Sequence, residues 1–155
     1  MRYLRNMPFQ IICLLLAVFL GMGIHARAGH PAFAGDLLEA FQKLNGEHDQ
    51  LKLSRITRFG WDRMFVFPPA TPLTEISKIL GAPVPAAILK TGIEQREDIN
   101  LLVFLNGQSI VEVSPVPRTG VDFLVGMVGI SLDANNAVFA KASSGKILAL
   151  AELKE

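Results

Sequence analysis

Hydrophobic residues in the stretch 53–67 recur at every second position. Positions 59, 61, 65 and 67 hold Phe, Trp, Phe and Phe, and an arginine at position 63 fills the gap in that row. Apolar residues also occupy positions 56, 64 and 66, which would lie on the opposite face. A period of two with aromatic and β-branched residues is typical of a strand, and apolar residues on both faces indicate that the strand is covered on both sides. We therefore predict a central strand over residues 53–67.

Residues 36–46 have the spacing of a short amphipathic helix. Three leucines and a phenylalanine, at positions 37, 38, 41 and 44, fall on one helical face. Asp36 before them is a good N-cap residue, and Asn45-Gly46 after them is a good stop signal. We predict a helix over residues 37–45.

A second amphipathic helix follows the double proline Pro68-Pro69, which must end the strand because proline cannot donate to a β-ladder. Thr71 has the position of an N-cap, and Pro72 has that of the first helical residue. Gly81 follows the last apolar position and ends the pattern. We predict a helix over residues 72–80 and interpret the proline-rich turn as a crossover.

Antiparallel strands account for the second half of the chain. Asn106-Gly107 between two apolar runs predicts a type I′ hairpin that joins strands at 100–105 and 108–114, and further strands are expected at 123–132, 137–142 and 147–153. Because the helices are confined to the first half, we expect an α+β fold with a single antiparallel sheet of about five strands and two short helices packed on one face. The side chains expected in or near the core are Trp61, Phe65, Leu80, Leu102, Phe104 and Val111.

The first 28 residues have the pattern of a secretory signal peptide. Two early arginines precede an apolar run at 11–24, which is shorter than the roughly 20 residues of a membrane-spanning helix. Small residues then lead to Ala28, so we expect a signal peptide at 1–28 and a single small domain at 29–155, periplasmic or secreted. Cleavage after Ala34 and an uncleaved N-terminal anchor are the alternatives.

Cleavage after residue 28 would change the composition in two ways. It would remove Cys13, the only cysteine, and leave no thiol for a disulfide, a nucleophile or a metal ligand. It would also change the formal net charge from +1 to −2, because 12 Lys and Arg then face 14 Asp and Glu. The remaining basic residues are scattered along the sequence, whereas a nucleic-acid surface needs them clustered. We expect no nucleic-acid partner, and contact with a membrane only through the signal peptide before cleavage.

Candidate residues for metal or cofactor chemistry are few. The chain without residues 1–28 keeps two histidines, His30 and His48, and no pair of histidines has the spacing of a zinc site. We therefore expect no metal and no other cofactor. His48 lies in a polar loop, where a solvated side chain is the simplest interpretation.

Asp62, Arg63 and Glu97 are the candidate binding residues. Asp62 and Arg63 fall in the predicted strand, where successive side chains point to opposite faces, so we do not expect them to pair with each other. Arg63 is placed to lie over an aromatic neighbour, and Asp62 either ties a loop as a structural carboxylate or recognises a partner. Glu97 belongs to the charged run 94–98, which is either a solvated loop or a loop that binds a partner.

Two classes of function fit these features. The first is a non-enzymatic binding or interaction module, inhibitor-like or immunity-like, whose partner is another envelope or secreted protein. The second is a small hydrolase or other enzyme that uses the carboxylates of Asp62 and Glu97, with His48 brought to them by the fold. A cleft that joins Asp62 to His48 would favour the enzyme.

A resemblance to a loosely defined family of small exported bacterial proteins of unknown function rests on two segments. These are residues 61–81, WDRMFVFPPATPLTEISKILG, and residues 99–113, INLLVFLNGQSIVEV. The family pattern is Trp-Asp, an apolar strand that ends in Phe, a proline-containing turn with Tyr-Thr, a short helix that closes on Leu-Gly, and a hairpin. Ala70 stands where that pattern has tyrosine. The resemblance implies export and carries no known activity.

Overall fold

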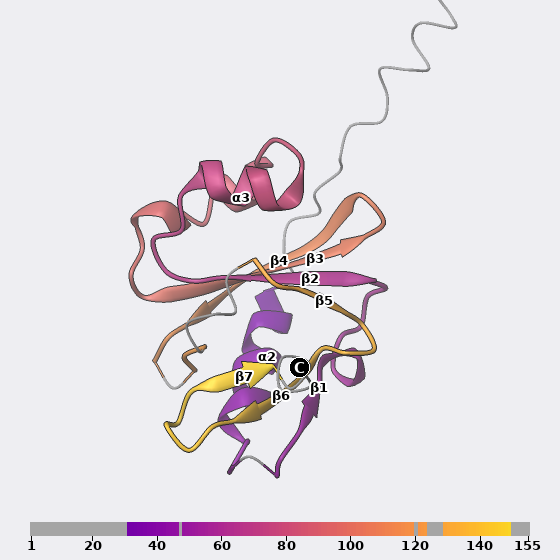
Figure 1. Cartoon of the computed structure of the whole chain (residues 1–155), viewed down its shortest axis with the longest axis vertical. Coiled ribbons are helices and arrows are strands. Elements are labelled where there is room, and N and C mark those ends of the chain that lie inside the picture. Colours follow the sequence, from indigo (N-terminus) through magenta and orange to yellow (C-terminus); the bar gives the residue numbers. More distant parts are fainter. Residues whose placement is uncertain (1–30, 47, 120, 124–128, 150–155) are drawn as a thin grey trace, which may run out of the picture.

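Seven strands form two antiparallel sheets in the computed structural model, which describes residues 31–46, 48–119, 121–123 and 129–149. The strands of the four-stranded sheet, in spatial order, are β4 (Ser109–Pro117), β3 (Ile99–Asn106), β2 (Arg63–Phe67) and β5 (Ser131–Asp133). Those of the three-stranded sheet are β1 (Leu51–Lys52), β6 (Val138–Lys141) and β7 (Ile147–Ala149). Figure 1 shows the three-stranded sheet below the four-stranded one.

The helices cover opposite faces of the four-stranded sheet (Figure 1). The long helix α2 (Pro31–Gln42) lies on the lower face, where its buried Leu37 and Phe41 share a core with Leu102 and with residues of the three-stranded sheet. On the upper face, α3 (Leu73–Leu80) and α4 (Ala86–Leu89) form a second core with the other side of the sheet. The short 3-10 helices are η1 (Leu53–Arg55) and η2 (Ile93–Gln95). The α+β class is confirmed, whereas the single five-stranded sheet with both helices on one face is wrong.

The edge strand β4 carries two prolines on its outer side. The backbone N–H of Arg118 donates to the carbonyl of Asp98 at 2.9 Å, and this bond fixes which β4 residues face β3 with their backbone groups. Because the backbone groups of an antiparallel strand alternate in direction, those of Pro115 and Pro117 point away from β3. An edge that lacks these two N–H donors is a poor template for another strand. The four-stranded sheet ends at this edge, and β6 pairs with β1 and β7 in the other sheet.

The β3–β4 hairpin is present, but its turn lies one residue later than predicted. Asn106 pairs with Ser109, so the turn residues are Gly107 and Gln108, and of these only Gly107, at φ 59°, has a positive φ. Glycine at the first turn position is the requirement of a type II′ turn, so the type I′ prediction is wrong. A bulge accompanies this shift, because one extra residue, Val111, lies between the partners of Leu105 and Phe104.

The predicted strand over 53–67 holds only for its last third. Residues 53–55 form η1, and β2 begins at Arg63. The intervening aromatic residues are core residues of a loop: Phe59 and Trp61 meet the ring of Phe104 edge to face, with centroids 5.4 and 5.2 Å apart. The spacing of Phe59 and Trp61 thus reflects their packing against the ring of Phe104 and not a strand conformation.

The two main helices begin at other residues than predicted. The helix α2 begins at Pro31, so Asp36 lies inside it, and α3 begins at Leu73 with Pro72 as its N-cap. Thr71 does not cap α3; its buried hydroxyl donates to the carbonyl of Pro68 at 2.6 Å. The predicted stop at Gly81 is confirmed, because this residue caps α3 with φ 66°.

The remaining expectations agree in part with the described residues. The strands expected at 123–132, 137–142 and 147–153 correspond to β5, β6 and β7, although residues 124–128 and 150–153 lie outside the description. The predicted signal peptide at 1–28 also lies outside it. No helix among the described residues is long and apolar enough to span a membrane. The six expected core residues are all buried or packed against a buried cluster: Trp61, Phe65, Leu80, Leu102, Phe104 and Val111.

Candidate functional site

Asp62 and Arg63 both hold the turn of the β3–β4 hairpin. The Asp62 carboxylate accepts a hydrogen bond from the Gly107 N–H at 2.6 Å, and the Arg63 guanidinium donates to the Gly107 carbonyl at 2.7 Å. The two side chains also form an ion pair at 3.6 Å, which the sequence argument excluded. That argument fails because Asp62 precedes β2 and is not bound to strand geometry. Asp62 thus ties a loop through its hydrogen bond to Gly107, which is the structural role that the sequence suggested for it. A role in recognition stays a prediction.

Glu97 lies at the other end of the four-stranded sheet. Its backbone carbonyl accepts a hydrogen bond from Arg118 at 3.1 Å, and its residue is exposed. The eight residues of β3 separate this end from the hairpin turn that Asp62 holds, a distance of roughly 25 Å at the usual rise of a strand. The structure therefore does not bring the carboxylates of Asp62 and Glu97 together.

His48 lines an open hollow of about 580 Å³ beside the three-stranded sheet. One wall is the loop that follows α2, and the other is the β6–β7 turn. The lining residues are Leu44, Asn45, Gly46, His48, Lys141, Ala142, Ser143 and Gly145. Neither Asp62 nor Glu97 is among them, so this hollow does not bring His48 to either carboxylate.

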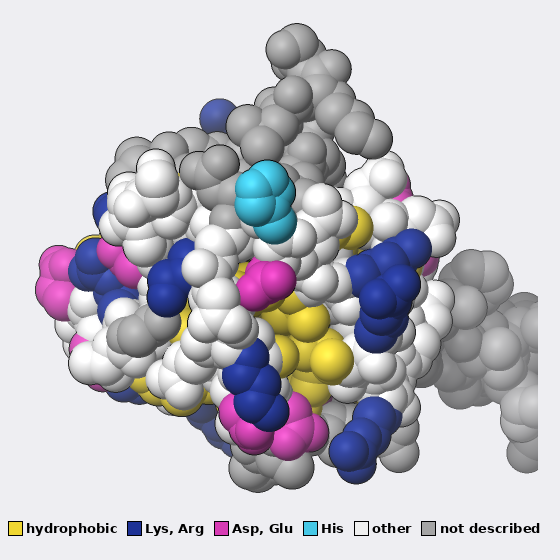
Figure 2. Space-filling model, turned by 90° about the horizontal axis from the view of Figure 1, so that it is seen from below, with side chains coloured by type: hydrophobic (Ala, Val, Ile, Leu, Met, Phe, Trp, Pro, Cys, Tyr) yellow, Lys and Arg dark blue, Asp and Glu magenta, His cyan; other side chains and the backbone are white. Residues whose placement is uncertain are grey.

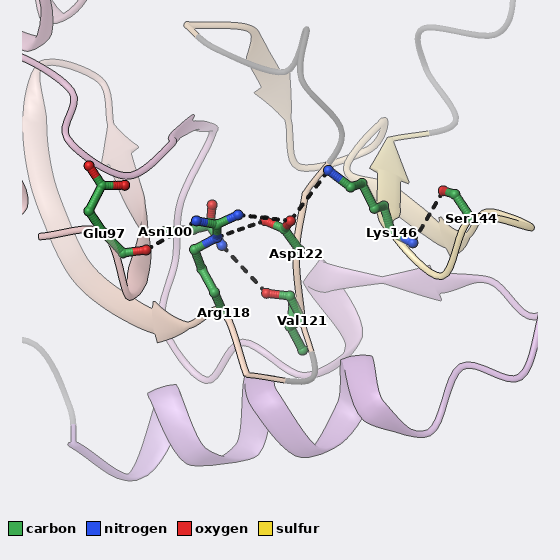
Figure 3. A network of polar contacts seen from close by, with 7 residues as sticks. All are labelled: Glu97, Asn100, Arg118, Val121, Asp122, Ser144 and Lys146. Carbon is green, nitrogen blue, oxygen red and sulfur yellow. Dashed lines mark hydrogen bonds and ion pairs between the residues drawn. The ribbon is translucent and has the colours of Figure 1, made fainter.

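A polar network ties the β6–β7 turn to the four-stranded sheet (Figure 3). The Arg118 guanidinium donates two hydrogen bonds to the carboxylate of Asp122, both at 3.1 Å. Lys146, at the end of the turn, approaches the same carboxylate at 3.4 Å. The Asp122 carbonyl also accepts the Ile147 N–H at 2.6 Å. Asp122 thus connects the two sheets next to the hollow.

The charges of this network stabilise one another. Hydrogen bonds from Arg118 hold the pKa of the Asp122 carboxyl below its ordinary value, and partial burial opposes this only in part. The charge of Arg118 and, to a smaller extent, that of Lys146 add to the lowering. The hydrogen bonds to Asp122 likewise raise the pKa of the Arg118 guanidinium. Both shifts favour the charged forms of Asp122 and Arg118, so these two groups are ionised over the whole neutral range.

Three basic residues are close together in the sequence: Lys52 ends β1, Arg55 ends η1, and Arg58 lies in the loop that follows. Lys52 is half-buried, whereas Arg55 and Arg58 are exposed. Within the described residues none of the three pairs with a carboxylate, unlike the basic residues at 43, 63, 96, 118 and 146. Two contacts anchor this segment to the rest of the fold: Leu53 is fully buried, and the Trp61 indole donates to the Thr57 hydroxyl at 2.9 Å.

Glu112 is a buried carboxylate that the sequence argument missed. It is 1 % exposed and lies opposite Phe104, on the face of β4 that α2 covers. The hydroxyl of Ser114, also 1 % exposed, donates to it at 2.9 Å. A glutamate in an alternating strand is normally predicted to face solvent, whereas Glu112 lies on the face of β4 that packs against α2. No local sequence signal reveals that cover.

Comparisons with known proteins give no relative for this chain: no family model, no curated protein and no solved structure matches it. Within the described residues, no group of three or more His, Cys, Asp or Glu side chains is arranged to hold a metal ion.

Proposed function

We propose that the protein is an exported, non-enzymatic binding module that recognises an acidic surface of another envelope or secreted protein. The contact surface is the segment 52–58, which presents Lys52, Arg55 and Arg58 and is named here the basic segment. Among the described residues no carboxylate pairs with these three, and this observation carries the proposal. Figure 2 shows the protein from below, the side of the three-stranded sheet, where hydrophobic side chains reach the surface between basic and acidic ones.

The cost of burying a charge and the rigidity of the basic segment both support this proposal. Burying an unpaired guanidinium is costly, so a surface that presents three cations is best covered by carboxylates that complement them. The basic segment is anchored by the buried Leu53 and by the Trp61–Thr57 hydrogen bond, so its backbone is already ordered before binding. The face in Figure 2 carries basic, acidic and apolar side chains, and such a mixed surface suits a protein partner, which makes both charged and apolar contacts.

A protein partner is favoured over nucleic acid by the charge of the whole chain. After loss of residues 1–28 the formal charge is −2, and three cations neutralise few phosphates. The inhibitor-like or immunity-like character expected from the sequence belongs to the same proposal. Export is part of it too, and the expected cleavage after Ala28 is read directly by N-terminal sequencing of the exported protein.

A charge-reversal experiment tests the proposal. The processed chain is immobilised, exposed to envelope extract, and any captured protein is identified and purified. The variant Arg55→Glu/Arg58→Glu is compared with Lys78→Glu/Lys90→Glu, which changes the net charge equally on the upper helical layer. We expect the captured partner to be acidic. In binding assays with the purified proteins, the wild type and the second variant should bind it, whereas the first variant should not. Equal binding by all three, or capture of nucleic acid in place of protein, would refute the proposal.

A further inference from the structure

The hollow that His48 lines has the dimensions of a small-molecule site. Its volume of about 580 Å³ lies within the range of pockets that hold small ligands. It is open to solvent and lies between the loop after α2 and the β6–β7 turn. It is therefore accessible without any movement of the fold.

The lining of the hollow favours a negatively charged ligand. Lys141 contributes an ammonium group, and no carboxylate among the described residues pairs with it. His48 adds an imidazole, and Asn45 and Ser143 add an amide and a hydroxyl. No Asp or Glu is among the described lining residues. Two charged groups of the adjoining described residues have partners: the Asp49 carboxylate accepts the Asn45 N–H, and Lys146 pairs with Asp122. Glu47, between Gly46 and His48 in the chain, lies outside the described residues.

The two walls are held by hydrogen bonds of their own. In the first wall the Asn45 N–H donates to the Asp49 carboxylate at 3.0 Å, and the Asp49 N–H donates to the Gly46 carbonyl at 3.2 Å. In the second, the Ala142 N–H donates to the Lys146 carbonyl at 2.8 Å, and the Lys146–Asp122 ion pair ties the turn to the rest of the fold. A site with ordered walls loses little conformational entropy when a ligand binds.

We propose that this hollow binds the oxyanion group of a small ligand, a carboxylate or a phosphate ester, between Lys141 and His48. Lys141 supplies the fixed positive charge, and His48 donates a ring N–H. Asn45 provides a further donor that orients the bound oxygen atoms. The site is separate from the basic segment, so the inference does not depend on the proposed protein partner.

Titration of the ¹⁵N-labelled processed chain tests the inference, with inorganic phosphate and acetate as separate probes and choline chloride as a cationic control. We expect saturable amide shifts confined to residues 44–48 and 141–146 with at least one of the two anions. Preference for phosphate identifies a phosphate ester site, and preference for acetate identifies a carboxylate site. Shifts that are not saturable, or that spread over the other basic surfaces, would refute a built site.

Three variants separate charge from shape. Lys141→Gln and His48→Gln are each expected to weaken binding about tenfold, whereas Lys90→Gln, which removes one charge from the upper layer, leaves it unchanged. Gly46→Gln adds bulk to the wall at a position where a Cβ meets no atom within 4 Å, so it should reduce binding while the fold remains intact. An unchanged dissociation constant in both Lys141→Gln and His48→Gln, with native spectra, would overturn the assignment.

Discussion

Replacing Asp122 by Asn tests whether the network in Figure 3 joins the two sheets. The variant keeps the size of the side chain and removes its charge. The two hydrogen bonds from Arg118 then lose their ionic character, and the ion pair with Lys146 at 3.4 Å is lost. The backbone bond from Ile147 to the Asp122 carbonyl remains, so the chain path does not change.

The expected loss of stability follows from the exposure of the groups. The Asp122 side chain is 27 % exposed, whereas its two partners are 39 % and 38 % exposed. Hydrogen bonds to a buried charge contribute about 1.5–3 kcal/mol, and exposed ion pairs contribute about 0.2–1 kcal/mol. Asp122 lies between these cases, and Asn still accepts one neutral hydrogen bond. We expect Asp122→Asn to lower the free energy of unfolding by about 1–2 kcal/mol at pH 7.

The pH dependence of this difference identifies its cause. Because the pKa of folded Asp122 is lowered, its contribution is complete above the unfolded pKa of about 3.9 and is lost as the pH falls through the folded pKa. Asn does not titrate. The difference between wild type and variant should therefore be constant from pH 7 to about pH 5 and then shrink toward zero as the medium becomes more acidic.

Urea unfolding followed by the fluorescence of Trp61, the only tryptophan, measures this difference. Asp36→Asn is the matched control, since it makes the same substitution at an exposed side chain of α2, and its effect should stay within about 0.5 kcal/mol. A loss below about 0.5 kcal/mol for Asp122→Asn would show that the network does not join the sheets. A difference that persists unchanged in acid would show that the effect is not ionic.

Three further predictions concern two backbone positions with positive φ and the buried hydroxyl of Thr71, and the same unfolding assay measures each of them. Ala70 has φ 56°, so Ala70→Gly should stabilise the fold by about 0.5–1 kcal/mol, and an unchanged or lower stability would contradict this. Gly129→Ala should cost about 1–3 kcal/mol, because φ is +70° and the new Cβ would lie 2.8 Å from Ile79 Cδ1; a neutral result would mean that the strain is absent. Thr71→Val should cost about 1–2 kcal/mol by leaving the Pro68 carbonyl without its donor, and a loss under about 0.3 kcal/mol would refute that bond.

Local signals in the sequence were sufficient for elements whose ends are set by nearby residues. Gly81 ends α3 because a left-handed cap needs glycine, and the apolar runs around Asn106-Gly107 form the hairpin. The turn type was missed because the bulge at Val111 depends on how β4 meets β3 and α2. The identity of the N-cap was missed because buried Thr71 binds the Pro68 carbonyl, a contact decided by the packing of the crossover.

Long-range pairing explains the larger errors. Nothing near residues 51–52 shows that they pair with β6, 86 residues later, so the second sheet could not be deduced from local patterns. Local sequence patterns could not reveal the hollow or the polar network either. His48 and Lys141 meet at one hollow, and Asp122 joins Lys146 to Arg118, only through the topology of β6 and β7. By contrast, the basic segment is contiguous in the sequence, although its lack of acidic partners is visible only in three dimensions.

The dissociation constant of the captured partner, measured at about 50 and 200 mM salt, tests the binding proposal most directly. We predict that Arg55→Glu/Arg58→Glu weakens binding at least tenfold at the lower salt, and that the difference from wild type shrinks at the higher salt because screening weakens charge pairs. Lys78→Glu/Lys90→Glu should bind as the wild type does at both. Equal dissociation constants for the two variants at the lower salt would contradict recognition through the basic segment.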